Sequence, residues 1–112
     1  MTQTELTQIC RQFFVREFDT RDTLSLLNRY GYRFWSWGAN KFTNLANKGL
    51  LFKVQGHHHK GYVLITLNGG DLYDVRLITT TGKIKDTMTD LYFDQLFDAI
   101  DEKVEKLPNY TS

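Results

Sequence analysis

Three consecutive histidines in the stretch QGHHHKG, His57, His58 and His59, are the residues best suited to bind a metal. A zinc site needs three or four ligands that converge on the ion. Neighbouring residues of an extended chain point to opposite sides, so at most His57 and His59 share a face. The only cysteine, Cys10, falls in an apolar stripe at helical spacing, and no paired Cys/His motif is present. We therefore predict a polar hairpin loop here, with no metal and no other cofactor.

Nucleophilic and acid–base catalysis have no recognisable motif in the sequence. There is no GxSxG, and the stretch GANKFTNLANKG lacks the Gly-Lys-Ser/Thr ending of a phosphate-binding loop. Cys10 is expected to be an inert part of the core. We interpret the carboxylates near the C-terminus as the solvated face of a helix and not as a catalytic pair; they are Asp90, Asp94, Asp98, Asp101 and Glu105. We predict that the protein is not an enzyme.

The charged residues are distributed unevenly along the chain. The net charge is +1, yet residues 23–70 carry a charge of +6 and contain no carboxylate, whereas residues 71–112 carry −4. Aromatic residues alternate with basic ones in the same central region. A basic and aromatic region of this kind suits either a protein partner or a polyanion.

A protein partner is the first hypothesis for this region. Tryptophan is enriched at the energetic centres of protein interfaces, so an exposed Trp35 or Trp37 is the best candidate anchor. Asn40, Asn44 and Asn47 are spaced to lie on one side of a short helix next to these tryptophans. We predict that these five residues contact an unknown protein partner, and that the protein is an accessory module.

Nucleic acid is the alternative partner. Bases stack on aromatic rings and phosphates contact cations in proteins that bind single strands. The residues that would contact phosphate are Arg33, Lys41, Lys48, Lys53 and Lys60. The sequence does not show whether these side chains share one surface, so the two hypotheses stay open at this point.

The elements that position these residues follow from periodicity and capping signals. Residues 4–18 and a segment from Asp19 or Thr20 to Tyr30 are predicted helices, because apolar residues recur every three or four positions. Residues 32–38 are predicted to form a short strand, and residues 39–49 a short helix. Residues 50–86 alternate with a period of two and include the turn signal NGGD, which predicts an antiparallel meander.

The C-terminal element has the clearest pattern of all. Residues 90–106 form a predicted amphipathic helix that Thr87 or Thr89 would cap. Its expected buried stripe contains Phe93, Leu96, Phe97, Ile100, Val104 and Leu107. Together these elements predict one α+β domain over residues 1–112, with a meander of three to five strands packed by N-terminal helices and this C-terminal helix.

Composition favours a protein of the reducing cytoplasm. Hydrophobic residues make up 41% of the 112 residues, which is enough for a core. The longest apolar run is much shorter than a membrane span, the N-terminus does not resemble a signal peptide, and one cysteine cannot form an intrachain disulfide. We expect no contact with a membrane.

Three stretches also carry a resemblance to a known group of proteins. WSWGANKFTNLANKGLLFKVQG, KGYVLITLNGGDLYDV and YFDQLFDAIDEKVEK resemble small uncharacterised proteins of Bacteroides-type bacteria, which are often encoded on conjugative elements. The resemblance covers roughly residues 30–106. It implies an accessory protein in a mobile-element setting, near proteins that handle DNA, and it assigns no role to any residue.

Overall fold

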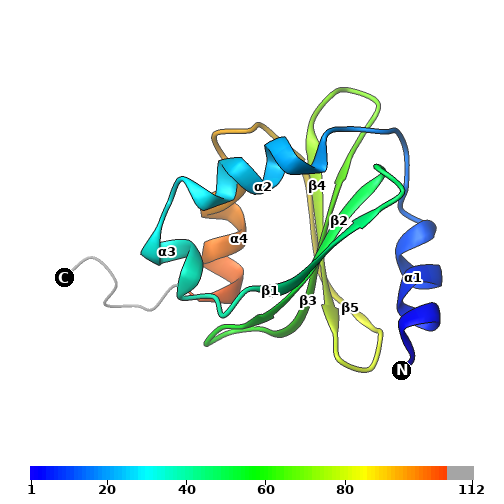
Figure 1. Cartoon of the computed structure of the whole chain (residues 1–112), viewed down its shortest axis with the longest axis horizontal. Coiled ribbons are helices and arrows are strands. Elements are labelled where there is room, and N and C mark those ends of the chain that lie inside the picture. Colours follow the sequence, from blue (N-terminus) through cyan, green and yellow to red (C-terminus); the bar gives the residue numbers. More distant parts are fainter. Residues whose placement is uncertain (106–112) are drawn as a thin grey trace.

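The computed structural model describes residues 1–105, which fold around one five-stranded sheet (Figure 1). The strands are β1 (Asn40–Leu45), β2 (Gly49–Gln55), β3 (Lys60–Leu67), β4 (Tyr73–Thr79) and β5 (Ile84–Leu91). They lie side by side in the order β1-β2-β3-β4-β5, and each strand is antiparallel to its neighbours. The predicted α+β fold with an antiparallel meander is confirmed.

Helices cover both faces of the sheet. They are α1 (Gln3–Arg11), α2 (Thr20–Asn28), α3 (Tyr32–Trp35) and α4 (Leu96–Val104). Figure 1 shows α2, α3 and α4 on one side of the sheet and α1 on the other. Because successive strand residues point to opposite faces, Phe52 of β2 packs under α2–α4 and Leu51 packs under α1. Within residues 1–105, no helix is long and apolar enough to cross a membrane.

The first two helices begin where the capping signals predict and end earlier than expected. Thr2 and Glu5 form a capping box at the start of α1. Asp19 caps α2 by accepting a hydrogen bond from the Arg21 amide at 2.9 Å. The prediction that the first helix continues to residue 18 is wrong, because the Phe18 amide donates instead to the Asn47 carbonyl, beyond the end of β1.

Residues 32–38 are not a strand, contrary to the prediction from their alternating aromatics. α2 ends at Asn28, and Gly31, whose φ of +58° is readily adopted by glycine, precedes the helical turn α3 as its N-cap. Phe34 and Trp37, three residues apart, both enter the core, whereas Trp35 between them is exposed. This spacing is helical, and it places the two tryptophans on opposite sides of the turn.

Residues 40–45 form an edge strand where a short helix was predicted. β1 pairs with β2 through Thr43 and Leu51, and a bulge follows Asn40, with Lys41 at a φ of +55°. Because of the extra residue in the bulge, Ala39 and Phe42, which are three positions apart, pack near the same core. Phe42 packs near the α2–α4 core and Leu45 belongs to the α1 core, so these two residues lie on opposite faces of the sheet.

The C-terminal helix begins later than predicted, because β5 continues to Leu91 and pairs with Tyr73 of β4. Thr87 and Thr89 lie in β5, so neither caps α4. Phe93 precedes the helix and is 64% exposed, which contradicts its predicted burial. The buried stripe is otherwise confirmed for Leu96, Phe97, Ile100 and Val104. Leu107 lies outside the described residues.

Candidate functional site

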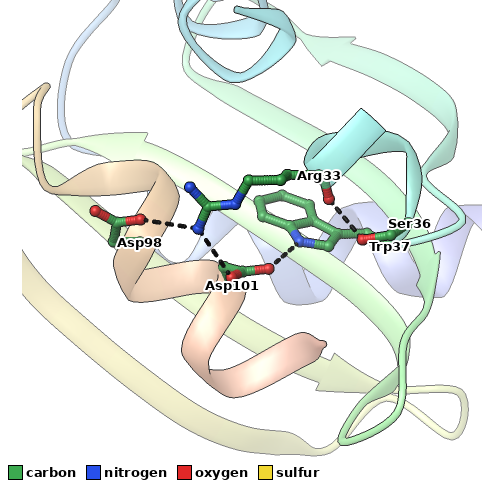
Figure 2. A network of polar contacts seen from close by, with 5 residues as sticks. All are labelled: Arg33, Ser36, Trp37, Asp98 and Asp101. Atoms are coloured by element: carbon green, nitrogen blue, oxygen red, sulfur yellow. Dashed lines mark hydrogen bonds and ion pairs between the residues drawn. The ribbon is translucent and has the colours of Figure 1, made fainter. Parts of the chain in front are cut away.

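A polar network centred on the buried Asp101 holds α3 against α4 (Figure 2). The side chain of Trp37, which is fully buried, donates from Nε1 to Oδ1 of Asp101 at 2.8 Å. Nη2 of Arg33 lies 3.4 Å from Oδ2 of Asp101 and 3.4 Å from Oδ1 of Asp98. Both oxygens of the buried Asp101 carboxylate therefore have a partner, which is what makes its burial tolerable.

Aromatic stacking reinforces the same attachment. The rings of Trp37 and Phe97 are nearly parallel, with centroids 4.7 Å apart, and Tyr30 stacks on Phe97 at 3.8 Å. The guanidinium of Arg33 lies 5.0 Å from the centre of the Phe97 ring. A helix of only four residues is not stable by itself, so these contacts are what fixes its position.

The burial of Trp37 corrects one prediction. Trp37 was expected to be one of two candidate anchors for a partner, but its ring has no accessible surface. The helical turn directs Trp37 inward, and its backbone carbonyl also accepts a 2.7 Å hydrogen bond from the Gln55 amide of β2. Trp37 is therefore a structural residue that holds α3 in place.

The outer side of α3 has the opposite character. Tyr32 is 78% exposed and Trp35 is 69% exposed. Beside Trp35 lies an open, mainly apolar groove of about 280 Å³, which we call the Trp35 groove. Its lining residues come from α2, α3, β1 and the turn between α3 and β1, and they are Leu24, Asn28, Phe34, Trp35, Ala39 and Phe42. Phe42 is itself 40% exposed.

Two exposed basic residues are the sequence neighbours of residues that line the Trp35 groove. Arg29 directly follows Asn28 at the end of α2, and Lys41 directly precedes Phe42 on β1; both side chains are exposed. Among the described residues, the ion pairs of α3 involve Arg33 with two carboxylates of α4, those of Asp98 and Asp101. The backbones of Arg29 and Lys41 therefore lie next to the groove, and their exposed side chains add positive charge to its neighbourhood.

The three asparagines do not form one surface, contrary to the prediction. Asn40 donates to the Gly38 carbonyl at 2.8 Å, next to the bulge of β1. Asn44 and Asn47 bond to each other at the other end of that strand, where Ala46 and Asn47 both have positive φ and form the turn into β2. Asn44 and Asn47 therefore shape the turn between β1 and β2.

Of the five basic residues predicted to contact phosphate, the structure brings only Lys53 and Lys60 close together. Lys53 lies opposite Tyr62, and Lys60 lies opposite Gln55, so Lys53 and Lys60 are diagonal neighbours on the sheet face that carries α1. Arg33, in contrast, packs against α4 on the other face. Lys48 lies in the turn between β1 and β2, and Lys41 lies in the bulge. These five residues do not form one continuous phosphate-binding face.

The histidine loop holds the end of α4. The His58 amide donates to the Val104 carbonyl at 2.8 Å, and His57 pairs with Glu105 through Nε2 at 3.5 Å. His59 is buried, and its Nε2–H donates to the Tyr62 carbonyl at 3.1 Å. Burial lowers the pKa of His59 below its ordinary value, and nearby Lys85 acts in the same direction.

The loop was predicted to be polar and to owe its glycines to the turn, and the structure gives a different reason for them. A Cβ on Gly56 would overlap the Val104 carbonyl, and one on Gly61 would overlap the Ile78 carbonyl. Over residues 1–105, no group of three or more metal-binding side chains is brought together. The two glycines allow the loop to pack closely against the backbone of Val104 and of Ile78.

Cys10 is buried as predicted, in the core under α1. Burial raises the pKa of its thiol to about 11, so at neutral pH the residue is a protonated thiol. A protonated, enclosed thiol is a poor nucleophile, which agrees with its expected role in packing.

Sequence reasoning missed Asp101 as a positioning residue, because it was assigned to the solvated row of the last helix. Asp101 follows Phe97 by four residues and Ile100 by one, so it borders the apolar stripe. That position could have indicated that Asp101 is buried.

No protein-family model matches the chain, and no curated protein and no solved structure shows significant similarity to it.

Proposed function

We propose that the protein is a non-catalytic interaction module, and that a protein partner inserts an apolar side chain into the Trp35 groove. The observation that carries this proposal is the exposure of Tyr32 and Trp35 on a helical turn whose inner side is anchored to α4. Tryptophan and tyrosine contribute strongly to binding when a partner removes them from water.

The anchoring of α3 supports the proposal because a fixed contact surface loses little entropy on binding. Trp37, Asp101 and Arg33 hold the turn from beneath, so the position of its backbone does not depend on the partner. Single exposed apolar residues are common on protein surfaces. Here two exposed aromatic residues, Trp35 and Phe42, line one groove, and a third, Tyr32, is exposed on the same helical turn as Trp35.

The size of the groove favours a side chain over a small molecule. Pockets for small ligands usually have volumes of about 300–1,000 Å³ and enclose most of the ligand. The Trp35 groove has a volume of about 280 Å³ and is open to solvent. A bulky apolar side chain that projects from a larger partner matches this shape better.

A peptide selection tests the proposal. Random peptides displayed on phage are selected on the wild-type protein, and the affinity of each enriched peptide is then measured on Trp35→Ala. We expect affinity to fall about tenfold or more, which is typical of the loss of a central aromatic anchor. Phe93→Ala is the matched control, because Phe93 is equally exposed but does not line the groove.

Two results would count against this function. If enriched peptides bind Trp35→Ala and the wild type equally well, the groove is not the binding site.

A separate experiment tests the nucleic-acid alternative: the protein is titrated with a labelled single-stranded oligonucleotide at low salt. Binding that Lys53→Glu with Lys60→Glu abolishes and that Trp35→Ala leaves intact would favour nucleic acid over a protein partner.

A further inference from the structure

We infer that the partner presents an acidic amphipathic segment, in which carboxylates flank the apolar side chain that enters the Trp35 groove. This inference rests on the proposed function and adds the chemistry of the partner to it. It follows from two independent properties of the groove: the charge of its rim and the shape of the strand at its edge.

The charge of the rim selects acidic partners. Arg29 and Lys41 adjoin the lining residues Asn28 and Phe42 in the sequence, and no carboxylate occurs anywhere in residues 23–70, which contribute all six lining residues of the groove. The carboxylates that reach α3 from α4, those of Asp98 and Asp101, already contact Arg33. A segment with carboxylates beside its anchor would gain attraction at both ends, and a basic segment would be repelled.

The other exposed aromatic pair provides a contrast within the molecule. Tyr92 is 58% exposed and Phe93 is 64% exposed, and acidic residues, Asp90 and Asp94, flank this pair in the sequence. The chain thus has one aromatic surface with basic neighbours and another with acidic neighbours. A partner with acidic flanks would bind the first and avoid the second.

The shape of β1 excludes simple strand addition as the binding mode. An edge strand recruits an extended peptide when its backbone groups are regular and unhindered. The bulge after Asn40 and the left-handed backbone of Lys41 interrupt the edge beside Phe42. Bulges and lysines are common means of blocking edge-to-edge pairing. Recognition at this site therefore depends on side chains, which makes the flanking charges decisive.

A charge-swapped variant tests the inference. Peptides selected on the wild type should be enriched in Asp and Glu next to an aromatic or aliphatic residue. Their affinity should fall roughly tenfold or more on Arg29→Glu with Lys41→Glu, and it should weaken with added salt. Lys53→Glu with Lys60→Glu is the matched control, since it makes the same change in net charge at residues that do not line the groove.

Each outcome has a separate meaning. Peptides that require Trp35 but show no acidic bias, or that bind the Arg29/Lys41 variant normally, would overturn the acidic-partner inference and leave the groove intact. The absence of any peptide that requires Trp35 would overturn the proposed function as well. Tyr92 and Phe93, with their acidic neighbours, could themselves enter the groove of a second copy. Concentration-dependent dimerisation of the protein alone, abolished by Phe93→Ala, would identify that second copy as the occupant and would overturn the inference of a separate acidic partner.

Discussion

Trp35 and Trp37 are separated by one residue, yet the first is 69% exposed and the second is fully buried. The inner side of this helical turn, with Arg33, Phe34 and Trp37, binds to α4 and β2. On the outer side Tyr32 and Trp35 are exposed, and Trp35 lines an open groove. The two tryptophans show that residue type alone does not distinguish a structural residue from a candidate binding residue. One tryptophan stabilises the turn, and the other is available to a partner.

The largest expected effect is on the inner side. Trp37→Ala should lower the free energy of unfolding by about 3–5 kcal/mol, because it leaves a cavity in the aromatic core. It also removes the indole donor of the buried Asp101 carboxylate. Urea denaturation followed by circular dichroism gives the value. A loss below about 1 kcal/mol would be typical of a surface site and would break the comparison.

The polar network beneath α3 should show the same division on a smaller scale. Asp101→Ala should cost about 1–3 kcal/mol, because the buried indole N–H of Trp37 loses its acceptor. Asp98→Ala is the control, since its side chain is 67% exposed and an exposed ion pair is worth about 0–1 kcal/mol. Equal costs for the two variants in urea denaturation would show that burial of Asp101 does not matter.

The pH dependence of stability tests the loop that holds the end of α4. The pKa of His59 is lower in the folded state than in the unfolded chain. The unfolded state therefore binds more protons below about pH 6.5, and stability should decrease as the pH falls through this range. The slope is at most about 1.4 kcal/mol per pH unit for one proton. Urea denaturation from pH 7.5 to pH 5 measures it.

A variant without the titrating ring isolates this contribution. His59→Gln keeps a hydrogen-bond donor and does not titrate, so its stability should change less between pH 7.5 and pH 5 than that of the wild type. Burial and the neighbouring Lys85 both disfavour the charged ring in the folded state. An unchanged slope in the variant would mean that His59 does not produce the pH dependence.

The smallest effect on stability is expected on the outer side. Trp35→Ala should change the free energy of unfolding by no more than about 0.5 kcal/mol, as is usual for exposed positions. The same substitution should weaken peptide binding strongly, which separates binding from folding. A large loss of stability in the same urea assay would mean that Trp35 is a structural residue and would remove the contrast with Trp37.

The sheet and the last helix were predictable because their signals are local and periodic. The alternation in β2 places successive residues on opposite faces of the sheet, the NGGD turn joins β3 to β4, and the stripe from Leu96 to Val104 marks the buried side of α4. The segment 32–49 was predicted with strand and helix exchanged. Its aromatic residues mix two faces of a short turn, and its bulge imitates helical spacing.

The candidate site was predictable only in part for the same reason. Trp35 was identified from its residue type, but the exclusion of Trp37 depends on Phe97, Asp101 and Phe52, which are distant in sequence. The groove itself combines α2, α3 and β1. No single stretch of sequence contains it. The setting near DNA-handling proteins that the resemblance implies stays a prediction.

Collisional quenching of the two indoles tests the central contrast most directly. Trp35→Phe leaves only Trp37, and Trp37→Phe leaves only Trp35, so each fluorescence signal belongs to one ring. We predict that acrylamide quenches Trp35 readily and hardly reaches Trp37. A bound peptide from the selection should protect Trp35 and leave the quenching of Trp37 unchanged. Equal protection of both rings in the free protein, or quenching of Trp35 that the bound peptide does not reduce, would contradict the account.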